Sequence, residues 1–243
     1  MIKDKMQQLL PRRGGRLASM KSFVCPLAVV ILAFLSIRAQ EMPKEQGNFR
    51  SPDLVEIIRL DPTIKLDIRY ATSNNFLGRP IYSEARAFLQ RPAAEALRRV
   101  NQSLRKKGYG LLVFDGYRPW SITKKFWDET PAEKRQFVAD PSKGSKHNRG
   151  CAVDLSLFDM KTGKEVEMPS AYDEFSERAY PSYQGGTKSQ RHLRNLLRAA
   201  MEANGFTVNQ YEWWHFDYRG WQHYPLLNIA FNQIAQPGHA ERK

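Results

Sequence analysis

The sequence has 243 residues, which is enough for one large domain together with short terminal segments. Apolar residues make up 42% and aromatic residues 12%, which supports a real core and excludes a chain that is disordered throughout. The formal net charge is +13, but residues 1–39 hold seven of the 38 Lys and Arg residues and one of the 25 acids, leaving +7 for the remainder. Lys and Arg are scattered in that remainder, which argues against a nucleic-acid-binding protein.

Residues 1–39 have the pattern of a secretory signal peptide. Basic residues precede an apolar run over residues 23–37, and Ala39 provides a small residue for cleavage. The run is shorter than the roughly 20 residues of a spanning helix, so we expect export to the periplasm with no membrane span after cleavage. An uncleaved signal anchor is the alternative, and Met20 is a second candidate start. Cleavage would leave Cys151 as the single cysteine, so no intramolecular disulfide is expected.

The rest of the chain divides into a polar linker over residues 40–52, a domain over residues 53–232 and a tail over residues 233–243. Within the domain, alternating apolar residues over 64–71 predict a strand. The later segments are typical of three helices, one opened by Pro92 and stopped by Gly108, one over 119–129 and one within 189–206. Further strands are expected over 110–117, 151–157 and 211–218, with a turn over 159–166 that leads into another. Because no regular βαβ repeat is present, we predict the α+β class, with a mainly antiparallel central sheet flanked by helices.

The segment SKHNRGCAVD, residues 145–154, places a histidine, a glycine turn and an aspartate in close succession. Alternation after Gly150 turns Asp154 away from the apolar side of the strand, and His147 can fold back toward it. Imidazole and carboxylate groups are frequent Zn²⁺ ligands, so a zinc site at the sheet is one interpretation. A salt bridge or a turn cap is the other.

The segment YEWWHF adds a second histidine, His215, three residues after Glu212. Two histidines and Asp154 would leave the fourth tetrahedral position of a zinc ion open, as catalysis requires. A base that is not itself a ligand is needed near metal-bound water, and Glu212 suits that role. The alternative is an aromatic core strand whose histidine bonds to a neighbour.

The segment FDGYRPW places Arg118 directly after a buried strand and a tight turn. A guanidinium fixed at a strand end could hold a carboxylate or stabilise the charge that develops on an attacked carbonyl. The alternative is a surface arginine packed over Tyr117 or Trp120.

In combination these motifs resemble the zinc D-alanyl-D-alanine dipeptidases. That group includes the vancomycin-resistance dipeptidases and is related to zinc D,D-carboxypeptidases and to the hedgehog signalling domain. The motifs that carry the resemblance are Ser145-x-His147-x-x-Gly150-x-Ala152-x-Asp154, Glu212-x-x-His215 and the run Asp115-Gly116-Tyr117-Arg118-Pro119. Residues 67–80 and 168–179 also look like family segments, and the resemblance covers roughly residues 53–231.

The resemblance implies one zinc ion per chain and assigns a role to each motif residue. His147, Asp154 and His215 would be the zinc ligands. Glu212 would act as the general base and acid, and Arg118 would stabilise the tetrahedral intermediate.

The resemblance also implies a substrate site. Ser145 would help to hold the substrate carboxylate, and Asp173 would pair with the substrate ammonium. Tyr70 and Phe126 would line the small pocket. Cys151 stands where the family has a small residue, and no catalytic role is expected for it.

The expected function is the hydrolysis of D-Ala-D-Ala, or of a similar D,D-dipeptide, in the cell envelope. The nearest alternative is a D,D- or L,D-carboxypeptidase that acts on peptidoglycan stem peptides. Asp173 discriminates between them, because a longer chain would bring an uncharged amide to that carboxylate and leave its charge unpaired. A zinc-bearing binding domain without turnover is a third reading, against which the presence of Glu212 and Arg118 weighs. The secretory leader departs from well-known relatives that act in the cytoplasm.

Overall fold

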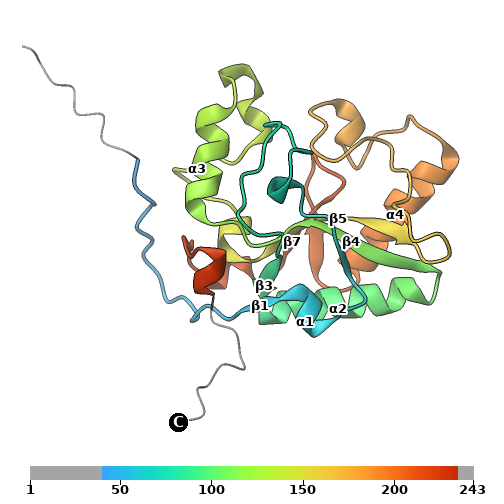
Figure 1. The fold of residues 1–243 in the computed structure, drawn as a ribbon, viewed down its shortest axis with the longest axis horizontal. Helices are drawn as coiled ribbons and strands as arrows, with labels where there is room; N and C mark the ends of the chain where they lie inside the picture. The colour runs from blue at the N-terminus through green and yellow to red at the C-terminus, as the bar shows by residue number, and fades with distance from the viewer. Residues whose placement is uncertain (1–39, 235–243) are drawn as a thin grey trace, which may run out of the picture. The chain divides into compact units, whose positions relative to one another are not determined.

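The computed structural model describes residues 40–234. A five-stranded sheet lies at the centre of the fold (Figure 1). The strands are β1 (Leu54–Glu56), β2 (Lys65–Leu66), β3 (Phe88–Gln90), β4 (Tyr109–Asp115), β5 (Ala152–Asp159), β6 (Phe206–Val208) and β7 (His215–Tyr218). The α-helices are α1 (Ile57–Leu60), α2 (Arg91–Arg105), α3 (Trp120–Glu129) and α4 (Lys188–Glu202).

The sheet has the order β2-β4-β5-β7-β6, and β1 pairs separately with β3. The β2–β4 pair is parallel, whereas β4–β5, β5–β7 and β6–β7 are antiparallel. The predicted α+β class with a mainly antiparallel sheet is therefore confirmed. The 1–39 segment and residues 235–243, which include most of the expected tail, lie outside the described residues.

Helices α2 and α4 pack against each other and against the strands, because each has one apolar stripe (Figure 1). Pro92 lies in the first turn of α2, where its missing N–H costs nothing, and Gly108 follows the helix with φ +86°. Helix α4 begins with a capping box between Thr187 and Gln190, which satisfies two backbone donors at its start. The buried leucines of these stripes are Leu97, Leu104, Leu193 and Leu197.

Both faces of strand β5 are covered, so Asp154 does not face solvent. Every residue from Ala152 to Phe158 is buried, although alternation does place Asp154 opposite the main core. A second apolar cluster of Leu112, Phe114 and Phe158, with Tyr172 packed against it, lies apart from that core. A carboxylate at this position is desolvated and needs compensating partners.

Two expected strands are shorter than predicted, and a third is reduced to a single bridge. In the 64–71 segment only Lys65–Leu66 pairs with β4, and the chain then turns through a 3-10 helix at Arg69–Ala71. In the 211–218 segment β7 begins at His215, because its N–H closes a turn onto the Glu212 carbonyl at 3.3 Å. After the 159–166 turn only an isolated bridge forms, between Phe158 and Glu165.

Residues 40–52, expected as a linker, have no regular secondary structure but are attached to the domain. The Glu45 carboxylate accepts the Leu226 N–H at 2.6 Å and pairs with the Arg149 guanidinium. Arg149 is buried and lies in the turn that also contains His147. The segment therefore supports the loop that presents one of the candidate metal ligands.

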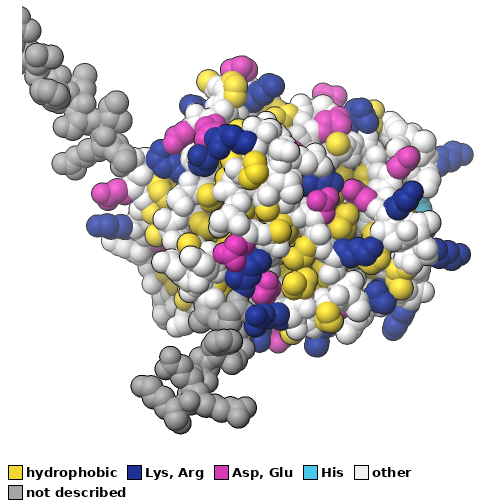
Figure 2. All heavy atoms as spheres, in the orientation of Figure 1, with side chains coloured by type: hydrophobic (Ala, Val, Ile, Leu, Met, Phe, Trp, Pro, Cys, Tyr) yellow, Lys and Arg dark blue, Asp and Glu magenta, His cyan; other side chains and the backbone are white. Residues whose placement is uncertain are grey.

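The surface carries charge of both signs. On the face drawn in Figure 2, Lys and Arg side chains are spread around the molecule with Asp and Glu between them. Among residues 40–234, no helix combines the length and apolar character needed to cross a membrane.

We expect Glu45→Gln to destabilise the protein by about 2 kcal/mol, because hydrogen bonds to charged groups contribute about 1.5–3 kcal/mol each. The change removes the charge that compensates the buried Arg149. Urea unfolding followed by circular dichroism measures the difference. Glu41→Gln, in the same segment but exposed, is the matched control and should shift the free energy of unfolding by no more than about 0.5 kcal/mol. Equal unfolding midpoints for the two variants would contradict the anchoring role of Glu45.

Candidate metal-dependent active site

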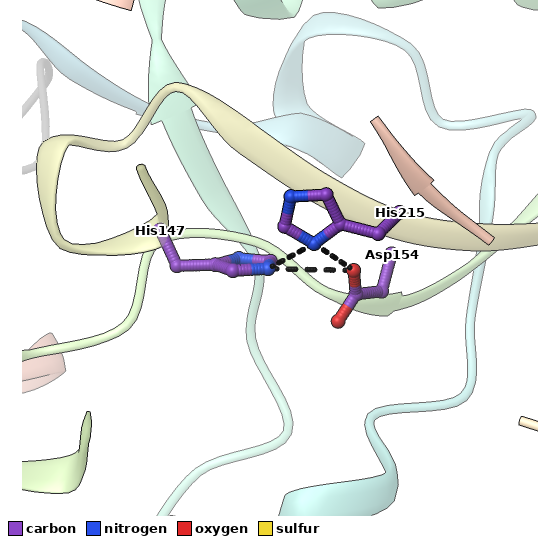
Figure 3. Close-up of side chains that lie close together, drawn as sticks. All are labelled: His147, Asp154 and His215. Carbon is purple, nitrogen blue, oxygen red and sulfur yellow. Dashed lines mark hydrogen bonds and ion pairs between the residues drawn. The ribbon is translucent and has the colours of Figure 1, made fainter. Parts of the chain in front are cut away.

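Three side chains from separate segments converge at the edge of the covered sheet face (Figure 3). Asp154 lies on β5 directly opposite His215, the first residue of β7, so the strand pairing fixes their separation. His147 comes from the 3-10 turn before β5, which ends at Gly150 with φ +66°. The positive φ favours glycine at position 150, and a Cβ there would also lie 2.5 Å from the Leu54 side chain.

The hydrogen-bond partners of the two imidazoles decide which nitrogens face the centre. His147 Nδ1 lies 2.7 Å from the Gly116 carbonyl, and His215 Nε2 lies 2.9 Å from Asp217 Oδ1. Carbonyl and carboxylate oxygens only accept, so these outer nitrogens carry the protons. His147 Nε2 and His215 Nδ1 then face the centre of the cluster and lie 3.1 Å apart. Asp154 Oδ1 lies 3.3 Å from the first and 3.0 Å from the second.

Three potential ligand atoms this close together could bind one cation between them. Bonds of about 2.0–2.1 Å to a tetrahedral ion would separate its ligand atoms by about 3.3 Å, close to the three distances in the structure. Asp154 Oδ1 is buried without a hydrogen-bond partner, whereas Oδ2 accepts the Tyr172 hydroxyl at 3.1 Å. Burial alone would raise the pKa of Asp154, but the two imidazoles outweigh it and hold that pKa below its usual range. Two imidazoles and one carboxylate suit a divalent transition-metal ion.

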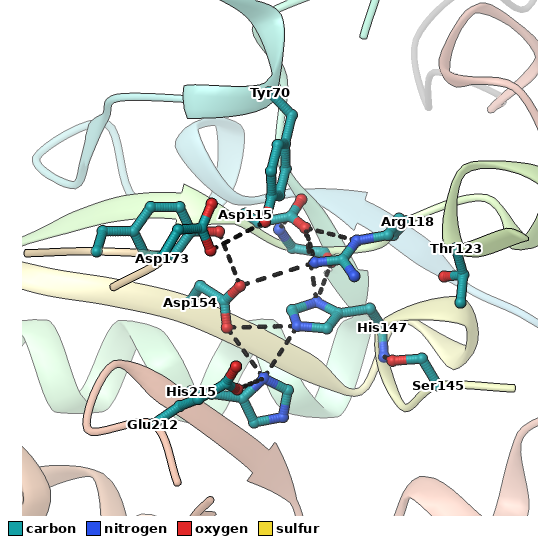
Figure 4. Close-up of polar contacts among 12 residues, drawn as sticks. Tyr70, Asp115, Arg118, Thr123, Ser145, His147, Asp154, Asp173, Glu212 and His215 are labelled. Atoms are coloured by element: carbon teal, nitrogen blue, oxygen red, sulfur yellow. Dashed lines mark hydrogen bonds and ion pairs between the residues drawn. The ribbon is translucent and has the colours of Figure 1, made fainter. Parts of the chain in front are cut away.

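Arg118 lies beside this cluster and is only 8% exposed, so the alternative of a surface arginine is wrong. Its Nε and Nη2 donate to Asp115 Oδ2 at 3.0 and 2.7 Å, and Nη2 lies 3.8 Å from Asp154 Oδ2 (Figure 4). The other Asp115 oxygen accepts the Tyr82 hydroxyl at 2.8 Å. Burial would lower the pKa of Arg118, but the Asp115 carboxylate more than offsets this and the pKa is raised. The guanidinium therefore stays charged in a fixed orientation.

Tyr70 and Phe126 form an aromatic wall under this guanidinium. The ring centroids lie 5.3 and 4.8 Å from the Arg118 Cζ atom and 4.6 Å from each other. This is the range of cation–π contacts, which add to the restraint on Arg118. Both residues line the cavity beside the metal-ligand cluster, as the resemblance implies.

The cavity has a volume of about 290 Å³, at the small end of ligand sites. Glu212 lines it from the turn before β7, and its Oε2 lies 3.7 Å from His215 Nδ1. Burial raises the pKa of Glu212 to about 7, against the opposing effect of His215. A carboxylate whose pKa lies near neutrality can both accept and return a proton.

Asp173 lies elsewhere on the cavity wall, with one oxygen in use and one without a partner. Oδ1 accepts the Tyr70 hydroxyl at 3.2 Å, while Oδ2 is buried with no hydrogen bond. Burial, and then the charges of Asp154 and Glu212, raise the pKa of Asp173 well above its usual range. Its φ of +58° is unusual for a residue other than glycine, although Asp tolerates this region better than most. A cationic group bound here would supply the missing partner.

Ser145 also lines the cavity, at the start of the His147 turn. Its Oγ accepts the His147 backbone N–H at 3.2 Å, and its own N–H donates to Asn148 Oδ1 at 2.8 Å. The Asn148 amide donates in turn to the Arg118 carbonyl at 2.9 Å and to Thr123 Oγ1 at 2.8 Å. One buried asparagine therefore ties the metal-ligand loop to the arginine loop and to α3.

Several residues of the site were not identified from the sequence. Asp115 belongs to the recognised motif and precedes Arg118 by three residues, but its function in fixing the guanidinium depends on the turn geometry. Asp217 follows His215 by two residues, and on a strand that spacing places both side chains on one face. Tyr172 and Asn148 are neighbours of recognised residues and gave no signal of their own.

The chain is similar in sequence to proteins of one peptidase family. The profile of the D-Ala-D-Ala dipeptidase family matches residues 50–234. The chain is 33% identical over 186 residues to the D-alanyl-D-alanine dipeptidase of Escherichia coli, covering 76% of this chain and 95% of that protein. It is also 33% identical over 171 residues to the enzyme of the same name from Enterococcus faecalis, covering 63% and 85% of the two chains.

A solved structure of the LD-carboxypeptidase LdcB overlaps with 71% of each chain at 21% identity and a TM-score of 0.43. The assignment rests on the sequence matches, which span nearly the whole described domain. The chain belongs to the D-Ala-D-Ala dipeptidase family of metallopeptidases.

Proposed function

We propose that this chain is a zinc-dependent dipeptidase that hydrolyses D-Ala-D-Ala, or a similar D,D-dipeptide, to free amino acids. The observation that carries the proposal is the convergence of three potential metal-ligand atoms beside a small cavity. That cavity is also lined by Glu212, whose carboxyl group has a pKa of about 7, and by the fixed guanidinium of Arg118. A bound zinc ion supplies Lewis acidity and lowers the pKa of water. His147, Asp154 and His215 would hold it.

Glu212 and Arg118 perform complementary parts of the reaction. With a pKa near 7, Glu212 accepts a proton from the attacking water and returns it to the leaving amine. Arg118 is buried and stays charged, and it donates to the oxygen of the scissile carbonyl as negative charge develops there. Its bond to Asp115 keeps the donor in place before the substrate arrives.

The two ends of the dipeptide are recognised by charge and hydrogen bonding. Asp173 receives the substrate ammonium at its unpartnered Oδ2, and the pairing makes the ionised carboxylate favourable. Ser145 contributes to binding the substrate carboxylate from the opposite loop. The aromatic wall of Tyr70 and Phe126 limits the size of the substrate side chains.

We further propose that the enzyme acts in the periplasm. The support is the basic region, apolar run and small-residue exit within residues 1–39, together with the peptidoglycan origin of D,D-dipeptides. N-terminal sequencing of the protein recovered from the periplasmic fraction tests it, with residue 40 as the expected first residue.

We expect the purified protein to contain one zinc ion per chain. His147→Ala and His215→Ala each remove one of three ligands, so metal content after dialysis should fall well below one equivalent. Asp154→Asn should weaken binding as well, because it removes the anionic ligand. Elemental analysis measures the content, and full zinc occupancy in either histidine variant would refute the ligand assignment.

We expect Glu212→Gln to retain zinc and to lose at least about 10²-fold in kcat, the lower end of general acid–base effects. An amide cannot transfer the proton from water to the leaving amine. Hydrolysis of D-Ala-D-Ala, followed by the release of free D-alanine, gives kcat, and elemental analysis of the same sample gives the zinc content. Turnover near the wild-type value would exclude Glu212 as the base.

We expect N-acetyl-D-Ala-D-Ala to be a much poorer substrate than the free dipeptide. Acetylation removes the ammonium and leaves Asp173 buried without a partner, at a cost of about 1–3 kcal/mol or more. Asp173→Asn should narrow the difference in kcat/KM, and asparagine tolerates the positive φ of this position. If wild-type enzyme cleaves both compounds equally well, the carboxypeptidase alternative replaces the dipeptidase.

A further inference from the structure

The outer nitrogen of His215 is held by a charged pair, Asp217 and Lys146, that the reaction itself does not use. Asp217 Oδ1 accepts His215 Nε2–H at 2.9 Å, and Asp217 Oδ2 lies 3.2 Å from Lys146 Nζ. Asp217 stands two residues after His215 on β7, whereas Lys146 directly precedes His147 in the other ligand loop. The pair therefore links the two segments that carry the candidate histidine ligands.

Both oxygens of Asp217 have a partner, so the carboxylate is fixed in orientation. Its side chain is 18% exposed and that of Lys146 is 40% exposed. Lys146 Nζ also lies 5.5 Å from the centre of the Trp221 ring, which restrains the long side chain further. An isolated ion pair at this exposure would contribute little to stability, about 0–1 kcal/mol. Because Asp217 also accepts the imidazole N–H, the main effect of this pair is on the orientation of His215 and not on stability.

The two histidines differ in what orients them. The outer nitrogen of His147 donates to the backbone carbonyl of Gly116, which is set by the fold. That of His215 donates to a side chain, Asp217, whose position depends on a second side chain. A carboxylate partner also makes the imidazole a stronger donor to a metal than a carbonyl does, and partners of this kind change metal affinity by about 10–100-fold.

We propose that Asp217, held in place by Lys146, is a positioning residue for His215: it fixes the tautomer with Nδ1 free and turns that nitrogen toward the metal. The proposal rests on the proposed function, since it requires a metal at His147, Asp154 and His215. Lys146 lines the cavity but Asp217 does not, so Asp217 itself contacts the metal ligand and not the substrate.

Zinc affinity, measured by competition with a chromogenic chelator, tests the proposal independently of activity. Asp217→Ala should raise the zinc dissociation constant about 10–100-fold. Asp217→Asn should raise it less, because the amide oxygen still accepts the imidazole N–H. Lys146→Met should also weaken zinc binding. Lys146→Arg should bind zinc about as tightly as wild-type protein, since arginine keeps a charged donor. In saturating zinc, Asp217→Ala should lower kcat for D-Ala-D-Ala and leave KM unchanged.

Matched controls separate positioning from general stability. Glu202→Gln breaks an exposed pair with Arg198 on α4 and should leave zinc affinity unchanged. Thermal unfolding in chelator checks that each variant folds, and Lys146→Met, at a half-exposed side chain, remains testable if the Asp217 variants do not fold.

The outcomes distinguish this inference from the proposed function. If wild-type protein binds one zinc and cleaves the dipeptide while Asp217→Ala and Lys146→Met bind zinc as tightly, the positioning role alone is refuted. If wild-type protein binds no zinc, the proposed function fails and the positioning role fails with it. If the Asp217→Ala/Lys146→Met double variant binds zinc no more weakly than Asp217→Ala alone, the two residues act as one unit.

Discussion

The antiparallel pairing of β5 with β7 is the constraint on which the site depends. It places Asp154 opposite His215, and the backbone ladder holds this separation more rigidly than any loop could. The third candidate ligand, His147, arrives through a glycine turn immediately before β5. A one-residue shift in the register of β7 would turn His215 to the other face and dismantle the cluster. The helices on the opposite face stabilise this register through the core.

The buried charges around the site are arranged in compensating sets. Asp115 and Arg118 form one ion pair, and Asp217 and Lys146 form another at the rim. Asp154 is different, because one of its oxygens faces two imidazole nitrogens and has no hydrogen-bond partner. Such a group costs free energy when nothing positive lies between the three atoms. Metal binding and the stability of this region are therefore coupled in the same direction.

The sequence was most informative where local chemistry has a fixed period or a fixed turn. The stripes of α2 and α4, the stop at Gly108 and the turn at Gly150 follow from residue type and spacing, and the α+β class followed from their order. Strand ends were less predictable. The alternation of apolar residues over 64–71 continues beyond Leu66, where the edge strand β2 stops pairing with β4. Buried and more exposed side chains still alternate there, although the backbone no longer pairs with a neighbouring strand. The candidate ligands could be named from the motifs, but partners such as Asp115 and Tyr172 become visible only when their distances are known.

Three carboxylates of the site show how environment assigns different behaviour to one chemical group. Asp154 faces two imidazoles, so its pKa is lowered and it remains an anion. Glu212 is buried near His215 but without a strong ionic partner, so its pKa of about 7 lets it exchange protons at neutral pH. Asp173 is buried near these two like charges, so its pKa is raised well above its usual range. Its Oδ2 has no hydrogen-bond partner and could accept a hydrogen bond from a cationic group. Different pKa shifts within one cavity let the carboxyl group serve as ligand, base and substrate anchor. The different directions in which these pKa values are shifted follow from the neighbours that each strand or turn gives its side chain, and therefore from the fold.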